Sequence, residues 1–159
     1  MDDLLARTTG LPEITLPPGE ILVREGDAGN SLWVLVSGAL QVRKGGVAVN
    51  LLNRPGAVIG EISLLLDAPY SATVEASETS VLRHGADGRA LLGDPAITQL
   101  VAIGLAQRLT LVTTYLADLK HQYGDAPGLS MVHDVLNQLA QRQSVPARPG
   151  SARDPNPEY

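Results

Sequence analysis

The most informative stretch of the chain, residues 60–74, reads Gly60-Glu61-Ile62-Ser63-Leu64-Leu65-Leu66-Asp67-Ala68-Pro69-Tyr70-Ser71-Ala72-Thr73-Val74. Gly60 suits a tight turn, because glycine lets the backbone approach a ligand closely. The residues after it favour one short helical turn, whose unpaired N–H groups face outward from the helix N-terminus. Pro69 is expected to end this turn, and the residues from Ser71 on resume as a strand. The stretch therefore predicts a small site for a phosphate or a carboxylate.

This stretch has the pattern Gly-Glu-x-Ser-Leu-Leu, a short spacer, Pro, one variable residue and Ser-Ala-Thr-Val. The pattern resembles the phosphate-binding cassette of the cyclic nucleotide-binding domains, found in catabolite-activator-type regulators, kinase regulatory subunits and gated channels. The resemblance extends upstream through residues 18–27, 32–38 and 40–42, and covers residues 14–122. It implies a β-roll closed by a long C-terminal helix, with cAMP or cGMP as the ligand.

The resemblance also implies roles for individual residues. Glu61 would accept a hydrogen bond from the ribose 2′-hydroxyl, and backbone amides after Gly60, together with Ser71, would hold the cyclic phosphate. On the long helix, Val112 and Thr113 align with positions that reach over the base. The candidate ligand-binding residues are Gly60, Glu61, Ile62, Ser63, Tyr70, Ser71, Ala72, Val112 and Thr113.

Tyr70 departs from the family pattern, because an arginine stands after the proline in the resembled cassette. Arginine offers a permanent charge and a fixed fork of donors, whereas a tyrosine hydroxyl offers one neutral donor. Removing one partner of a buried charge pair costs about 2–5 kcal/mol, which is roughly thirty-fold to several thousand-fold in affinity. Tyr70 is expected to be a partly exposed ring at the mouth of the site, and Trp33 a surface or dimer contact.

The missing arginine leaves three outcomes open. Another cation replaces it, the site accepts a different ligand, or the site binds nothing. Two hypotheses follow. The first is a regulatory domain that senses a nucleotide or another anionic ligand at this degenerate cassette. The second is a pseudo-receptor that acts as a dimeric protein-interaction module.

Short apolar runs with a period of two dominate the chain up to about residue 85, and turn residues such as Lys44-Gly45-Gly46 separate them. Many short strands at close spacing are typical of a barrel or jelly roll. The sequence therefore predicts a mainly β, α+β fold, a double-stranded β-helix or jelly roll followed by a long helix. The expected strands are 21–23, 32–36, 40–42, 47–52, 58–59, 73–76 and 80–82.

Helical periodicity begins near Asp87, and Asp94-Pro95 is a good start for a helix that runs to about Tyr123. Along it, apolar residues recur at spacings of three and four, which is a coiled-coil pattern. We call these residues the seam: Ala102, Leu105, Leu109, Val112, Leu116 and Leu119. A second apolar face comprises Ile97, Val101, Gly104, Leu111 and Tyr115. Two apolar faces predict packing on the roll and on a second copy, as a homodimer, and the alternative is a monomer that buries both.

The sequence divides into four segments: a lead-in (1–13) with one or two helical turns, the roll with the long helix (14–123), a C-terminal helix (124–143) and a disordered tail (144–159). The C-terminal helix rests on an amphipathic pattern from Ser130 to Arg142. Four prolines among small and polar residues indicate the tail. Between Gly124 and the tail we expect no helix-turn-helix domain, because such a domain needs several helices of its own.

Composition also argues against several classes of function. The net charge is −5, from 12 basic and 17 acidic residues, which argues against a nucleic-acid partner. The chain has no cysteine and no signal-like start, and its most apolar window carries Arg108, so we expect a cytoplasmic protein without a membrane span. Only His84 lies near a strand, too few ligands for a metal enzyme of this topology. The sequence predicts no catalytic residue, no metal and no cofactor.

Overall fold

The computed structural model describes residues 2–123, 134–135 and 137–139. It falls into two compact units, the first ending at Val101 and the second beginning at Ala102. The first unit holds the three short helices α1 (Asp2–Arg7), α2 (Glu61–Leu66) and α3 (Gly88–Leu92), and α4 (Pro95–Tyr123) begins in it and continues into the second. The strands are β1 (Glu13–Leu16), β2 (Ile21–Val23), β3 (Leu32–Ser37), β4 (Leu40–Lys44), β5 (Val47–Leu52), β6 (Val58–Ile59), β7 (Thr73–Ala76) and β8 (Ser80–Gly85).

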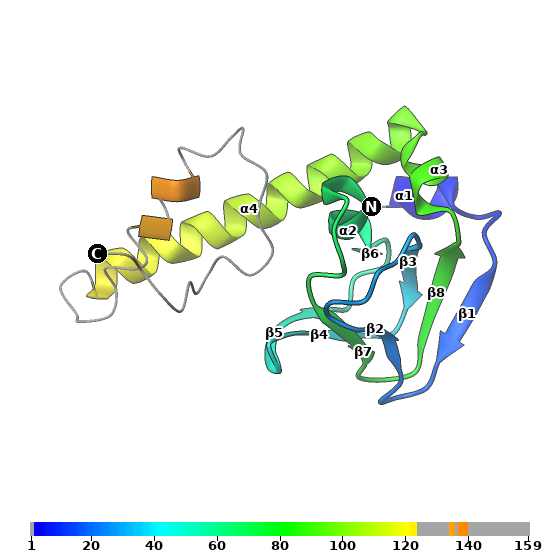
Figure 1. Cartoon of the computed structure of the whole chain (residues 1–159), viewed down its shortest axis with the longest axis horizontal. Helices are drawn as coiled ribbons and strands as arrows, with labels where there is room; N and C mark the ends of the chain where they lie inside the picture. Colours follow the sequence, from blue (N-terminus) through cyan, green and yellow to red (C-terminus); the bar gives the residue numbers. More distant parts are fainter. Residues whose placement is uncertain (1, 124–133, 136, 140–159) are drawn as a thin grey trace. The chain divides into compact units, whose positions relative to one another are not determined.

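Two antiparallel sheets form the first unit, with strand orders β1-β8-β3-β6 and β2-β7-β4-β5. They face each other, and α1, α2 and α3 lie toward one end of the roll (Figure 1). Each predicted strand is present, and β1 adds one that the period-two pattern did not single out. The β-roll with a long C-terminal helix is therefore confirmed.

The core lies between the two sheets, where the inward side chains of alternate strand residues meet. Leu35, Leu40 and Leu82 are fully buried at its centre. Trp33 joins them with 7% of its surface exposed, so the expectation that it is a surface or dimer contact is wrong. Its ring stacks on that of His84, with centroids 5.4 Å apart and planes 9° from parallel. A chain with no phenylalanine thus uses its only tryptophan as a core residue.

Among the described strands, β5 lies at the edge of its sheet and pairs with β4 alone. Its alternate residues Val47, Val49 and Leu51 are 64%, 57% and 47% exposed, whereas Leu52 packs on the core. The pairing of β5 with β4 shifts register between Val42 and Arg43, so the regular alternation of faces is interrupted within β5. This sheet edge therefore carries three exposed apolar side chains.

The helix α4 begins as predicted. Asp94 precedes it, and its side chain accepts a hydrogen bond from the Ala96 backbone N–H at 2.8 Å. Ile97 and Val101, from the second apolar face, are buried within the first unit. The other three residues of that face and the whole seam belong to the second unit.

By length and composition alone, α4 is apolar enough to cross a bilayer, with a mean hydropathy of 1.4 over its most apolar window. One such helix is weak evidence for a membrane span, because core helices of soluble proteins pass the same test. In the segment predicted as a C-terminal helix, residues 134–135 and 137–139 are helical. The remainder of residues 124–143 and the predicted tail lie outside the described residues.

Candidate functional site

The cassette begins at Gly60, whose backbone has a φ of 96° in the left-handed region. A Cβ at this position would lie 2.4 Å from the Ser31 carbonyl oxygen. Glycine is therefore required both by the backbone conformation and by the close approach of the loop before β3. The helix α2 follows at once, which confirms the predicted short helical turn.

The N-terminus of α2 presents backbone donors. The Leu64 N–H is the first to bond back along the chain, to the Gly60 carbonyl at 3.2 Å. Within the part of the chain that the structure describes, the backbone N–H groups of Ile62 and Ser63 have no acceptor. Unpaired N–H groups at a helix start carry partial positive charge. The cassette thus has the unpaired backbone donors that the sequence predicted, and their binding of an anion stays a prediction.

The helix ends earlier than expected. Asp67 adopts the left-handed conformation with a φ of 50°, and the Ala68 N–H donates to the Ser63 carbonyl at 3.0 Å. The Ser63 hydroxyl donates to the Ala68 carbonyl and closes the same turn. The prediction that Pro69 stops the helix is therefore wrong, because Asp67 has already reversed the chain two residues before it.

Glu61 is the first residue of α2 and is 3% exposed. A carboxylate in the first turn complements the positive end of the helix dipole. It also engages other groups of the protein, so it is not an unpaired buried charge. Its position at the start of the cassette fits the ribose-binding role that the family resemblance implies, and that role stays a prediction.

Tyr70 lies inside the roll with 8% of its surface exposed, so the expectation of a partly exposed ring is wrong. Its ring centroid is 6.1 Å from that of Trp33, and a Cβ on Gly29 would lie 1.9 Å from its hydroxyl oxygen. The Ser31 backbone donates a hydrogen bond to that oxygen. Burial raises the pKa of the Tyr70 phenol, and the hydrogen bond from Ser31 opposes this in part. The phenol is therefore neutral at pH 7 and retains one proton to donate.

The backbone of Tyr70 is held as firmly as its ring. Its N–H donates to the Asp27 carbonyl at 2.9 Å, and its carbonyl accepts from the Gly26 N–H at 2.9 Å. Two backbone hydrogen bonds from the loop between β2 and β3 therefore hold the cassette at Tyr70, the position where the resembled family has arginine. These two bonds and the space left by Gly29 account for the inward path of the side chain.

The next residue, Ser71, contacts a cation that no sequence motif singled out. The Lys44 ammonium donates to the Ser71 carbonyl at 2.6 Å and lies 2.7 Å from a carboxylate oxygen of Glu25. The other Glu25 oxygen accepts from the Gly45 N–H at 2.8 Å. The alternation of residues along β4 could have indicated this cation, because it puts Lys44 on the same face of the strand as Leu40 and Val42.

Two other expectations concern residues away from the cassette. Val112 and Thr113 belong to the second unit, so their contribution to the site stays a prediction. His84 accepts or donates a hydrogen bond with the Ser31 hydroxyl at 2.9 Å and stacks on Trp33, which gives it a structural role. Among the described residues, no group of three or more His, Cys, Asp or Glu side chains could hold a metal ion.

The part of the chain that matches a known family runs from the start of β1 to the end of β8. Residues 13–85 match the family model described as "Cyclic nucleotide-binding domain". The chain is 41% identical over 73 residues to the acetyltransferase Pat of Mycolicibacterium smegmatis, covering 44% of this chain and 22% of that protein. It is 39% identical over 72 residues to the cAMP-dependent protein kinase regulatory subunit of Yarrowia lipolytica, covering 45% and 19%.

The fold is also found among solved structures. PKAR CBD2 with bound Sp-2Cl-cAMPS superposes with a TM-score of 0.54 at 19% identity, covering 75% of this chain and 75% of that one. At that identity the likeness establishes the fold alone. The chain spans about a fifth of the length of the two curated relatives described above.

Proposed function

Residues 13–85 belong to the cyclic nucleotide-binding domain family, and on that premise we propose that the chain is a regulatory domain that binds a cyclic nucleotide or another anionic ligand. The ligand sits at the cassette, residues 60–74. The observation that carries this proposal is the N-terminal turn of α2, where the N–H groups of Ile62 and Ser63 have no acceptor among the residues that the structure describes. Main-chain donors of this kind favour a phosphate.

The related proteins support a regulatory role and no catalysis by this domain. One of them is named as the regulatory subunit of a cAMP-dependent kinase, and a solved structural neighbour holds a cAMP analogue. The acetyltransferase aligns over only 22% of its length, so its activity does not transfer to this chain. We infer that the domain contributes ligand sensing, with cAMP and cGMP as the first ligands to test.

The tyrosine at the arginine position sets the expected affinity. Replacing a charged fork by one neutral hydroxyl removes a charge-assisted contact, which costs about 2–5 kcal/mol when the partner is buried. Binding is then roughly thirty-fold to several thousand-fold weaker than in a relative that has the arginine. A ligand held at micromolar concentration by such a relative would need up to about millimolar concentration here.

Calorimetric titration of the purified chain with cAMP and cGMP tests the proposal, and Tyr70→Arg is the decisive variant. A receptor that lacks only its arginine gains affinity in this variant, by tenfold or more. Tyr70→Phe serves as the control, because it removes the hydroxyl without adding a charge. Absence of heat from both nucleotides in the parent chain and in Tyr70→Arg contradicts ligand sensing.

The burial of Tyr70 favours a second function, that of a pseudo-receptor and interaction module. Its ring occupies the space beside Gly29 and Trp33, and its hydroxyl is already bonded to Ser31. If this ring fills the ligand site, Tyr70→Arg restores no binding. The chain would then act through its surfaces alone.

The seam of α4 supports homodimerisation under either function. Its six residues follow alternating spacings of three and four, the pattern that packs one helix against another. Light scattering over a range of concentrations measures the mass directly. Leu109→Lys introduces a charge into the seam and is expected to give a monomer, whereas Leu111→Lys, off the seam, is the matched control. A chain that is monomeric at every concentration contradicts the dimer.

A further inference from the structure

Lys44 lies on the inner face of the roll, at the end of β4. Leu40 is fully buried and Val42 packs on the core, and alternation along the strand puts Lys44 on their side. The register shift beside Val42 does not disturb this, because the extra residue is Val49 on β5. Arg43 confirms the alternation from the opposite face, where its guanidinium lies 3.6 Å from a Glu75 carboxylate oxygen.

The Lys44 ammonium lies directly beside the cassette. It donates to the Ser71 carbonyl at 2.6 Å. This carbonyl and the Ala72 N–H belong to one planar peptide group, so the ammonium is within about 5 Å of the Ala72 nitrogen. Ser71 and Ala72 directly follow Tyr70, and the family resemblance gives them a part in holding the phosphate. A basic side chain is therefore present one residue along from the missing arginine.

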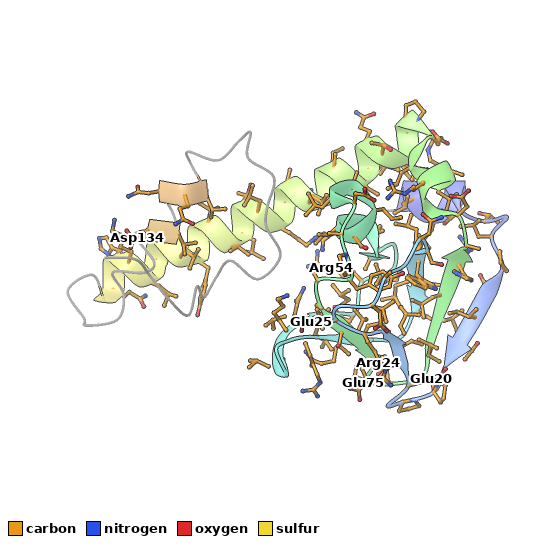
Figure 2. All side chains as sticks on the ribbon, viewed as in Figure 1. Glu20, Arg24, Glu25, Arg54, Glu75 and Asp134 are labelled. Carbon is orange, nitrogen blue, oxygen red and sulfur yellow. The ribbon has the colours of Figure 1, made fainter. Side chains whose placement is uncertain are left out.

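Glu25 holds Lys44 in this position. One carboxylate oxygen lies 2.7 Å from the ammonium, the other accepts from the Gly45 N–H at 2.8 Å, and the Glu25 backbone N–H donates to the Thr73 hydroxyl oxygen at 3.0 Å. Figure 2 labels Glu25 close to β4, at the side of the roll where these groups meet. The ammonium lowers the pKa of the Glu25 carboxyl, mainly through its hydrogen bond. The Glu25 carboxyl is thus ionised at neutral pH.

The ion pair is solvent-exposed, with 57% of the Lys44 side chain and 33% of the Glu25 side chain accessible. Exposed pairs of this kind stabilise a protein little, because water solvates the separated charges well. A flexible lysine can therefore leave Glu25 for a stronger acceptor at small cost. A phosphate at the cassette, held in addition by main-chain N–H groups, is such an acceptor.

We propose that Lys44 supplies the positive charge of the anion site in place of the arginine replaced by Tyr70, and that Glu25 competes with the anion for it. This inference rests on the proposed function of the cassette. It assigns a specificity-determining residue to a strand that the cassette motif does not include. It also explains how a phosphate can bind without arginine in a chain of net charge −5.

Three variants of the full chain test the inference by calorimetry with cAMP and cGMP. Lys44→Gln is expected to weaken binding at least tenfold. Arg43→Gln, the adjacent cation on the opposite face, changes affinity less than twofold. Glu25→Gln tightens binding severalfold, because the competing carboxylate is gone. Thermal melting of each variant confirms that the fold is intact.

The outcomes separate this inference from the proposed function. If the parent chain binds a nucleotide and Lys44→Gln binds it equally well, Lys44 is not the cation and the sensing function survives. As a second readout, amide chemical shifts of Gly45 and Ala72 are followed while cAMP, cGMP or inorganic phosphate is added. Shifts at both amides support the exchange of Glu25 for the anion. If the chemical shifts of both amides stay unchanged and calorimetry detects no binding to the parent chain, both proposals are overturned.

Discussion

Gly29 provides the room in which the Tyr70 side chain lies, and Gly29→Ala tests whether this packing is real. A Cβ at residue 29 would lie 1.9 Å from the Tyr70 hydroxyl oxygen and 2.2 Å from the ring carbon that bears it. Real Cβ contacts are not this short, so the ring or the loop must move. Gly29 is not among the glycines with positive φ, and the substitution therefore adds no backbone strain of its own.

The expected cost is that of overpacking a core, about 1–3 kcal/mol in the free energy of unfolding. For a unit of roughly 100 residues this lowers the melting temperature by roughly 4–20 °C. Trp33 is the single tryptophan of the chain, and its ring centroid lies 6.1 Å from that of Tyr70. Displacement of the Tyr70 ring should therefore change the tryptophan emission of the folded protein as well.

Gly10→Ala is the matched control, because nothing lies within 4 Å of a Cβ built there. It is expected to leave both the melting temperature and the emission nearly unchanged. Tyr70→Ala combined with Gly29→Ala gives a double-mutant cycle, in which the penalty of the alanine at residue 29 disappears once the ring is removed. If Gly29→Ala melts and emits like the parent chain, Tyr70 does not occupy this space, and the argument for a filled site fails.

Three further predictions concern titration and the backbone. Burial raises the pKa of Tyr70 above its value in the unfolded chain, so the unfolded state ionises first and stability falls above about pH 10; Tyr70→Phe removes this part of the fall in alkaline urea titrations. Lys44 lowers the pKa of the Glu25 carboxyl, so the stability that this ion pair contributes is present above the ordinary carboxyl pKa and is lost as the pH falls. NMR titration should find a higher Glu25 pKa in Lys44→Gln than in the parent chain. Gly38→Ala should cost about 2–5 kcal/mol in urea unfolding, because φ is 95° and the Cβ would lie 2.6 Å from the Ser80 Cα; an unchanged midpoint contradicts this.

The fold was predictable because period-two runs and turn residues report strands locally. The strands from β2 to β8, the short helix after Gly60 and the start of α4 at Asp94-Pro95 all follow from such local signals. Each depends on residues adjacent in sequence, and no distant contact is needed to interpret them.

The environment of the site was harder to predict, because it depends on distant neighbours. Tyr70 is expected from the sequence to be a partly exposed ring at the mouth of the site, and it turns inward because Gly29 and Ser31, on another loop, accommodate its ring and hydroxyl. Trp33 was misplaced for the same reason, since its partner His84 is on another strand. Lys44 was missed because its contact with Ser71 joins residues 27 positions apart, and no cassette motif includes β4.

The exposed edge strand β5 affects how the protein can be handled. Val47, Val49 and Leu51 are exposed on this strand, and the edge of a sheet is where another extended segment can pair. At high protein concentration the exposed edges of two molecules can therefore pair and cause slow aggregation. This would lower the amount of soluble protein without changing how each molecule recognises its ligand. A lysine in place of Val49 would make this edge less adhesive, and it would help any crystallisation or NMR work that needs concentrated samples.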